Sequence, residues 1–303
     1  MTGAQIAAKA AAQTTVISRR SKKDTRRESG FALIMWGALA IICLSIAVLL
    51  TTIVLDGLPR FSMDLFTNQP SKVNPATSGI QSAILGTLYL MAITAALVIP
   101  VGIATAVYLE EYADSTKWFN RFIELNIQNL ASVPSVVYGL LGLAFIVRGP
   151  LDLGPTLMAG GITLTLLVLP VVIIVAREAI RAVPPSIRDG ALALGATKWQ
   201  TIWKQVLPGS ISGIATGVIL ALSRAIGETA PLIVIGAAVS PRFNPDGLGS
   251  AFTAMPVQIF AYSKDADTQF LELASATILV LMGLLLLMNS IAIYLRNRFE
   301  QKW

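Results

Sequence analysis

The sequence contains no histidine, a single cysteine and few charged residues. Without histidine the chain lacks the commonest general base and metal ligand, which excludes catalytic and zinc sites built on imidazole. Because Cys43 is the only cysteine, no disulfide can form within the chain. Charged residues make up 13% of the chain and hydrophobic residues 54%, whereas soluble domains average about 25% charged residues. This balance indicates that lipid is the solvent and predicts an all-α membrane protein.

Six mainly apolar stretches are long enough to cross a bilayer as helices, which takes about 20 residues. They are residues 31–55, 80–107, 123–147, 156–175, 210–239 and 273–294. The first stretch is too long for a signal peptide and lacks a cleavage site, so we expect a membrane anchor. The third and fifth stretches contain polar or charged residues, and we expect these helices to face the protein interior.

Lysine and arginine residues gather on one side of this six-span arrangement. They lie mainly in the tail 1–29, in the loop 177–208 and after the last span. Because such residues stay on the cytoplasmic side, both termini are predicted to be cytoplasmic. The basic composition is then a topology signal, and nucleic acid is not an expected partner. We expect a disordered tail, 1–29, followed by one transmembrane domain, 30–303, in contact with membrane lipid.

The loop 177–208 is the most informative segment. Two prolines stop the incoming helix, after which Ser186 and Asp189 approximate a capping box. Gly195 suits the left-handed residue that often ends a helix. We therefore expect a short helix from Ile187 to about Leu194.

A second helix is predicted to begin at Thr197, where Gln200 completes another capping box, and to end at Pro208. It carries Trp199 and Trp203, which are either anchors at the membrane interface or contacts to a partner.

The first of these helices is slim, because Gly190 and Ala191 lie within it. Ile187, Ala191 and Leu194 are expected to share one face. That face has too little apolar bulk to hold lipid, so we expect it to fill a groove on a partner.

The run Asp189-Gly190-Ala191, followed by Gly195 and then by Leu207-Pro208, resembles the Glu-Ala-Ala loop of ABC importer permeases. In that family the loop forms a coupling helix that docks on a separate ATPase. This sequence departs from the family pattern in having Asp-Gly for Glu-Ala and Gln205 for an isoleucine. The resemblance implies ATPase coupling through Ile187, Asp189, Gly190, Ala191, Leu194, Gly195, Trp199, Leu207 and Pro208.

The fifth span carries Arg224 and Glu228, which should lie on the same helix face as Gly213 and Gly217. An arginine near mid-membrane costs at least ~2.5–3.5 kcal/mol on insertion scales, so it predicts a functional site. A guanidinium binds an oxyanion through two N–H donors. The alternative is that the two charges only neutralise each other. Pro231 is expected to kink the helix just beyond them.

The run Arg-Ala-Ile-Gly-Glu-Thr-Ala-Pro-Leu at 224–232 is similar to the fifth-helix motif of phosphate ABC importer permeases, and its ending resembles the A-type subunit. Segments 78–87 and 131–140 also resemble that family, and the resemblance covers residues 75–295. It implies a type I permease with six transmembrane helices and with Arg224 and Glu228 in the substrate pathway. It also implies a second permease subunit, two ATPase subunits, an extracytoplasmic phosphate-binding protein and a location in the bacterial inner membrane.

The sequence contains no Gly-x4-Gly-Lys-Ser/Thr phosphate-binding loop. We therefore expect ATP and Mg²⁺ on the partner ATPase, no cofactor in this chain and no enzyme activity of its own. Three alternatives stay open. They are a permease for molybdate or sulfate, an ion-coupled anion transporter that uses Glu228, and a membrane enzyme.

Two weaker features lie at the inner side. Glu110 and Glu111 follow the second span, where we expect a solvated loop end or a docking surface for a basic partner. Asn126, Gln128 and Asn129 are expected to form hydrogen bonds between helices, with lining of the substrate pathway as the alternative.

Overall fold

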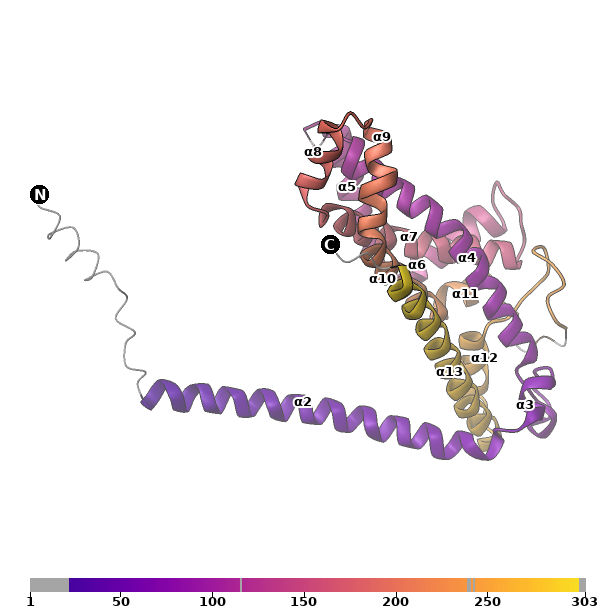
Figure 1. Cartoon of the computed structure of the whole chain (residues 1–303). Coiled ribbons are helices and arrows are strands. Elements are labelled where there is room, and N and C mark those ends of the chain that lie inside the picture. Colours follow the sequence, from indigo (N-terminus) through magenta and orange to yellow (C-terminus); the bar gives the residue numbers. More distant parts are fainter. Residues whose placement is uncertain (1–21, 115, 239–240, 242, 300–303) are drawn as a thin grey trace, which may run out of the picture. The chain divides into compact units, whose positions relative to one another are not determined.

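The computed structural model describes residues 22–114, 116–238, 241 and 243–299, and most of these residues are helical (Figure 1). The helices are α2 (Lys22–Gly57), α3 (Met63–Thr67), α4 (Gln81–Val107), α5 (Trp118–Ala131), α6 (Ser135–Leu141), α7 (Leu157–Arg181), α8 (Pro185–Ala193), α9 (Lys198–Thr201), α10 (Leu207–Ile226), α11 (Ala230–Val234), α12 (Met255–Ser263) and α13 (Thr268–Phe299). Three π turns continue α4, α6 and α9, at Tyr108–Tyr112, Gly142–Val147 and Ile202–Val206. Short 3-10 turns lie at Leu58–Arg60 and Pro75–Thr77.

The chain divides into two units between Thr52 and Ile53. The described part of the first unit belongs to α2, an apolar helix whose side chains are exposed over residues 30–52. Because α2 begins at Lys22, residues 22–29 of the expected tail are helical. The remainder of that tail lies outside the described residues. The second unit holds all the other helices.

Five stretches of the described residues are long and apolar enough to cross a membrane as single helices: Gly30–Arg60, Gln81–Tyr112, Leu157–Arg181, Lys198–Ile226 and Thr268–Arg298. Two further helical pieces, Trp118–Ala131 and Ser135–Val147, pass the same test together and meet at an angle of 108°. Counted as one bent span, this pair brings the total in the described residues to six, the number that the sequence predicts.

The break in the third span follows from Pro134, which has no N–H and disfavours a helical conformation in the residue before it. The break leaves carbonyl groups at the end of α5 without helical partners. The Tyr138 hydroxyl donates a hydrogen bond of 2.8 Å to one of them, the carbonyl of Leu130. Asn126 does not make the predicted hydrogen bond to another helix. Its side chain is exposed and donates to the Phe122 carbonyl within α5.

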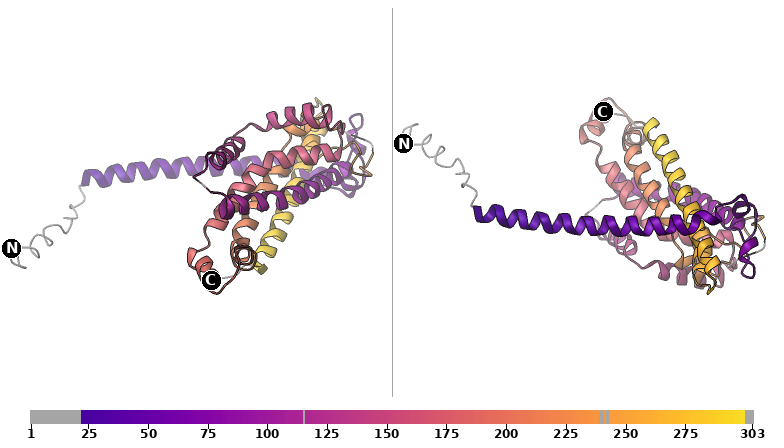
Figure 2. Two further views of the ribbon diagram at one scale, coloured as in Figure 1. Left: turned by 90° about the horizontal axis from the view of Figure 1, so that it is seen from above. Right: turned by 90° about the horizontal axis from the view of Figure 1, so that it is seen from below.

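Helix α7 packs against both α4 and α10, and α13 packs against α10 (Figure 2). Gly213 and Gly217 of α10 permit the close approach to α7 that their spacing predicts. A Cβ atom placed on Gly213 would lie 2.7 Å from the Ala179 Cβ, and one placed on Gly217 would overlap the Val175 side chain. The small residues therefore set the distance between these two helices.

Three buried threonines satisfy their hydroxyl groups inside the helices that carry them. Thr163 and Thr165 of α7 each donate a hydrogen bond of 2.7 Å to the carbonyl four residues earlier. Thr87 of α4 does the same and also accepts a bond of 2.9 Å from the N–H of Met255, at the start of α12. Polar groups thus enter the bundle without facing lipid.

At the end of the second unit opposite α8 and α9, Tyr262 joins α12 to the segment before α4 (Figure 1). Its hydroxyl donates to the Gly79 carbonyl at 2.8 Å and lies 2.8 Å from the Ser78 Oγ atom. Burial raises the pKa of Tyr262 to about 12, so the hydroxyl stays protonated at physiological pH and keeps its donor role. The ring stacks on Phe270, with centroids 5.6 Å apart.

Replacing Gly217 with valine is expected to destabilise the bundle, because the new side chain must displace Val175. Overpacking of this kind costs about 1–3 kcal/mol. The measurement is the apparent melting temperature of the detergent-solubilised chain. Gly283→Val in α13 is the matched control, since a Cβ there meets nothing within 4 Å. Equal melting temperatures for the two variants would contradict this packing.

Candidate functional site

The short helix of the loop 177–208 is present, but it begins earlier than the capping pattern predicts. Helix α8 starts at Pro185, its N-cap is Pro184, and no side chain caps it. The predicted capping box of Ser186 and Asp189 is therefore wrong. A proline suits the first position of a helix, because its missing N–H would have no helical partner there. Pro185 thus starts α8 before Ser186 is reached.

The end of α8 agrees with the prediction for Gly195. This residue has a φ of +83°, in the left-handed region that glycine favours. Its N–H bonds to the Leu192 carbonyl at 2.9 Å, and the Ala196 N–H bonds to the Ala191 carbonyl at 3.1 Å. These two bonds form a Schellman motif. The loop therefore turns sharply at Gly195.

The second helix begins as predicted and ends differently. The Thr197 N–H bonds to the Gln200 side chain at 2.9 Å, and the Gln200 N–H bonds to the Thr197 hydroxyl at 3.3 Å, which confirms the capping box. However, Pro208 does not end this helix. The π turn at Ile202–Val206 carries α9 directly into α10. In a regular α-helix Pro208 would leave the carbonyl four residues earlier unbonded, and the wider turn before it relaxes that conflict.

The residues of α8 divide between an inward and an outward face. Ile187 packs inward against a cluster that includes Ala106 and Val206. Leu194 is 90% exposed, and Asp189 and Gly190 are also exposed. The predicted common face of Ile187, Ala191 and Leu194 is therefore only partly present, because Ile187 and Ala191 are half-buried whereas Leu194, the residue that follows α8, is exposed.

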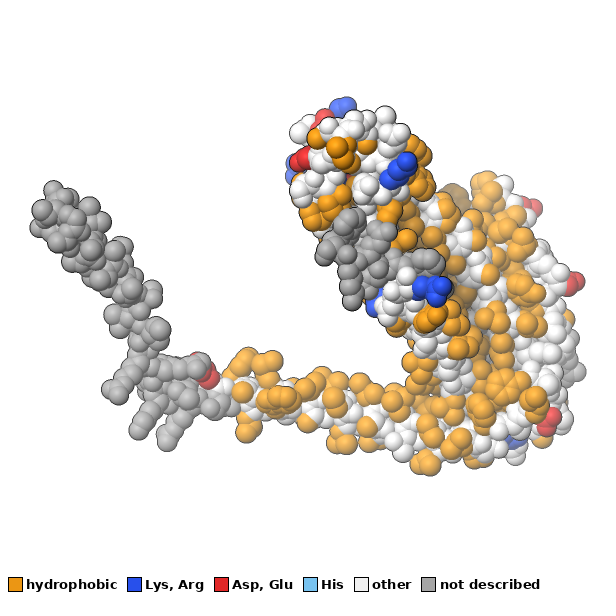
Figure 3. Space-filling view, in the orientation of Figure 1, with side chains coloured by type: hydrophobic (Ala, Val, Ile, Leu, Met, Phe, Trp, Pro, Cys, Tyr) orange, Lys and Arg blue, Asp and Glu red, His pale blue; other side chains and the backbone are white. Residues whose placement is uncertain are grey.

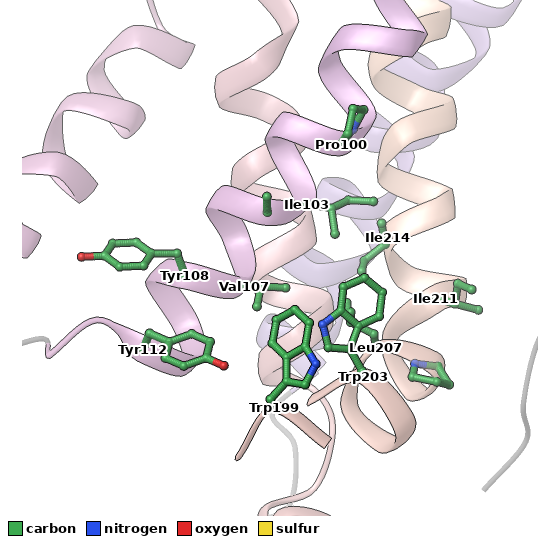
Figure 4. Close-up of a pocket in the computed structure, with 12 residues that line it drawn as sticks. Pro100, Ile103, Val107, Tyr108, Tyr112, Trp199, Trp203, Leu207, Ile211 and Ile214 are labelled. Carbon is green, nitrogen blue, oxygen red and sulfur yellow. The ribbon is translucent and has the colours of Figure 1, made fainter. Parts of the chain in front are cut away.

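Trp199 and Trp203 do not join the outward face of α8. Their rings lie 5.2 Å apart and line a cavity of about 750 Å³ between α4 and α10 (Figure 4). Tyr108 and Tyr112 line the same cavity, as do Leu207 and Pro208. Four aromatic rings at the inner ends of two spans are typical of the membrane interface. This placement favours an anchoring role for Trp199.

Glu110 and Glu111 do not form a solvated loop end, and that expectation for them is wrong. Their side chains are 15% and 10% exposed. Glu110 binds Arg181 through both carboxylate oxygens, at 2.8 and 2.9 Å. Glu111 pairs with Arg188 at 2.9 Å. Much of the positive charge of the basic loop is thus neutralised inside the chain itself. Sequence periodicity gives no signal for these pairs, because they join helices far apart in the sequence.

The same ionic cluster reaches a fourth helix, α5. Arg177 of α7 lies 3.5 Å from Glu110 and 3.0 Å from Glu124 of α5. The inner ends of α4, α5 and α7 are therefore held together by charge. Figure 3 shows charged side chains gathered at this end of the second unit, while hydrophobic side chains cover much of its flank.

The fifth span breaks at the predicted charged pair. Helix α10 ends at Ile226, and Glu228 lies in the non-helical segment before α11. The prediction that Glu228 shares a helical face with Gly217 is thus wrong. Pro231 cannot donate to the Gly227 carbonyl, so the helix is interrupted rather than merely kinked. The Arg224 Nε atom lies 3.5 Å from the Glu228 Oε1 atom, and the Arg224 side chain is 55% exposed.

Arg224 lies near the middle of the bundle. Its neighbours Ala221 and Ala225 pack in one cluster with Val168 of α7, which is close to the centre of that helix. Val133, from the break in the third span, packs on the same cluster. The two helix breaks therefore come together at mid-depth.

Beyond the breaks, α6 and α11 pack closely. A Cβ placed on Gly139 would lie 2.7 Å from the Pro231 Cα atom. A cavity of about 520 Å³ is lined by Thr229, at the end of the second break, and by residues of α11 and α12. Non-helical backbone at membrane depth is tolerated where it is buried in protein or lines a water-filled space. This region is therefore the candidate pathway site.

The arrangement can bind an anion. Within the described residues, Arg224 makes one hydrogen bond, through Nε, and none through its two terminal nitrogens. These nitrogens are free to donate in parallel to an oxyanion. The described residues contain no cluster of three or more metal-ligating side chains.

The chain is similar to known membrane transport proteins. Residues 98–301 match the family described as "Binding-protein-dependent transport system inner membrane component". The "Phosphate transport system permease protein PstA" of Yersinia pestis is 33% identical over 281 residues, covering 92% of this chain and 94% of that protein. The "Probable ABC transporter permease protein YqgI" of Bacillus subtilis is 34% identical over 227 residues, covering 75% and 76%.

The fold also matches a solved structure. A chain in the crystal structure of a bacterial alginate ABC transporter aligns with a TM-score of 0.69 at 16% identity, over 94% of this chain and 99% of that one. At that identity the likeness shows the fold alone. The fold is that of a type I ABC importer permease, as the sequence predicts.

Replacing Gly195 is expected to fray the end of α8. Valine tolerates a φ of +83° poorly, whereas asparagine adopts it more readily. A cost of ~1–2 kcal/mol corresponds to roughly tenfold faster hydrogen exchange at the bonded amides. The measurement is hydrogen–deuterium exchange of the 185–200 segment in Gly195→Val, with Gly195→Asn as the control. Equal protection in the two variants would contradict the role of the left-handed turn.

Proposed function

This chain belongs to the family of binding-protein-dependent transport system inner membrane components, and we propose that it is a permease subunit of an ATP-driven phosphate importer. Proteins of this family and fold are transport subunits rather than enzymes. Relatives that align over most of the chain are named phosphate transport permeases. In this function the chain forms half of the substrate pathway.

The observation that carries the proposal is the half-exposed guanidinium of Arg224 beside two broken helices. Its terminal nitrogens match the geometry of phosphate oxygens. Glu228, at 3.5 Å, orients the Nε side of the group and leaves the other side for the anion. We propose Arg224 and Glu228 as pathway residues.

The exposure of Arg224 also supports a second, homologous permease subunit. An arginine that is 55% exposed at mid-depth would otherwise face lipid, which is costly. A sister subunit would cover this face and enclose an aqueous pathway between the two chains. An extracytoplasmic phosphate-binding protein would deliver phosphate to the outer end.

The outward face of α8 supports coupling to ATPase subunits. The exposed Leu194 side chain, with the small Gly190 nearby, forms a narrow apolar tip suited to a groove. Two ATPase subunits would bind ATP and Mg²⁺ and dock one on each permease. Their closure would displace α8 and rock the bundle, which gives alternating access.

We place the chain in the inner membrane of a bacterium with both termini in the cytoplasm. Lysine and arginine residues are concentrated on the side of the loop 177–208, which supports this orientation. The aromatic cavity lined by Trp199 and Trp203 lies at the same side, where a membrane interface is expected. No observation among the described residues favours transport of another oxyanion or coupling to an ion gradient.

Arg224→Gln is expected to abolish most phosphate uptake while the complex still assembles. The loss of charge-assisted hydrogen bonds worth ~1.5–3 kcal/mol corresponds to roughly one to two orders of magnitude. Arg224→Lys should retain part of the uptake, because the charge remains without the planar fork. The measurement is ATP-dependent uptake of radiolabelled phosphate into proteoliposomes that contain the purified complex.

Arg148→Gln is the matched control, since Arg148 is exposed and makes no salt bridge within the described residues. Normal uptake by Arg224→Gln would overturn the site. Failure of that variant to assemble would favour a purely structural ion pair. Phosphate uptake driven by an ion gradient without the ATPase would overturn the importer itself.

A further inference from the structure

Arg188, on the inward face of α8, binds two other elements at once. Its Nε atom lies 3.0 Å from the Glu111 Oε1 atom, at the inner end of α4. Its Nη1 and Nη2 atoms donate to the carbonyls of Val183 and Ile180, at 2.6 and 2.8 Å. One guanidinium therefore bridges α8, the C-terminal end of α7 and the π turn that ends α4.

The carbonyl contacts have a clear physical reason. The last carbonyls of a helix have no helical N–H donors and must be satisfied by other groups. At the end of α7 the Ile180 carbonyl already accepts a bond of 3.3 Å from the Val183 N–H, and Arg188 adds one donor to the Ile180 carbonyl and one to the Val183 carbonyl from a single planar group. A cation at the C-terminal end of a helix is also favoured by the helix dipole.

Helix α8 depends on this arginine because it has little else to hold it. None of its side chains is fully buried, and Ile187 is the residue by which α8 packs on the apolar cluster that includes Ala106 and Val206. Among the described residues, α8 makes one salt bridge, between Arg188 and Glu111. The two side chains are 21% and 10% exposed, so water screens the pair only weakly.

The π turn that carries Glu111 is held by further salt bridges. Glu110, next to Glu111 in the π turn, is held by Arg181 and Arg177 of α7. Arg177 in turn binds Glu124 of α5, the helix that leads to the break beside Arg224. A displacement of α8 that pulls on Glu111 therefore moves α4, α5 and α7 together.

We propose that Arg188 is the positioning residue that transmits movement of the coupling helix to the transmembrane bundle, through Glu111 and the end of α7. The inference rests on the proposed function, since it assigns the mechanical link of the same importer. Arg188 acts here inside the permease and makes no contact with ATP or phosphate. Without it, the partner ATPase still docks on the outward face of α8, but its closure moves α8 without moving the bundle.

The test compares Arg188→Gln and Glu111→Gln in the assembled complex, with phosphate uptake and ATP hydrolysis measured on the same proteoliposomes. Both variants are expected to keep the ATPase bound and hydrolysing, while phosphate transported per ATP falls roughly tenfold, a typical coupling between sites. The double variant should be no worse than Arg188→Gln alone, because that change already removes the contact to Glu111. Lys204→Gln is the control, as Lys204 is an exposed cation of the same loop without a salt bridge in the described residues.

An unchanged ratio of phosphate to ATP in both single variants would overturn the proposal, and so would additive losses in the double variant. If Arg188→Gln fails to assemble, Arg188→Lys decides the question. Lysine keeps the charge but cannot reach Glu111 and two carbonyls together, so a lowered ratio supports the link and a normal ratio overturns it.

Hydrogen–deuterium exchange of the purified chain separates this inference from the proposed function. Arg188→Gln should raise exchange in residues 185–196 even if the wild-type complex transports no phosphate. Failure of wild-type uptake would count against phosphate import alone. Unchanged exchange in that segment would count against the bridge.

Discussion

The carboxylates of Glu110 and Glu111 lie against arginines from two other elements, and the inner half of the bundle is built around these contacts. Charged groups at the edge of a bilayer are costly unless they reach water or each other. Here both carboxylates, Arg177 and Arg188 are largely withdrawn from water, whereas Arg181 stays mostly exposed. The two withdrawn arginines must therefore lie where a carboxylate can meet them. This requirement fixes how α4, α7 and α8 end relative to one another.

Much of the fold could be predicted from the sequence, because lipid imposes simple rules on length and polarity. The apolar runs indicate the spans, and the spacing of Gly213 and Gly217 indicates a close helix contact. Local backbone chemistry also predicts the turn at Gly195 and the cap at Thr197. These features depend on residues close together in the sequence.

The features that sequence reasoning missed depend on competition or on distant partners. Ser186 is a good capping residue, but Pro185 starts the helix first. Pro208 should end a helix, yet a π turn absorbs its missing donor. The partners of Glu110 and Glu111 follow the fold of three helices, which no local pattern encodes. Glu228 lies off the helical face for a related reason. Pro231 cannot donate a backbone hydrogen bond, and α10 ends at Ile226, before Glu228.

The π turn at Ile202–Val206 has a consequence for how this protein can evolve. One residue added to a helix rotates everything beyond it by about 100°. The turn therefore sets the rotational phase between the cap at Thr197 and the span α10, as well as their separation. Point substitutions leave that phase intact, whereas a single-residue insertion or deletion would turn the two tryptophans away from α4. Selection should consequently hold the length of this junction more strictly than the identity of most residues in it.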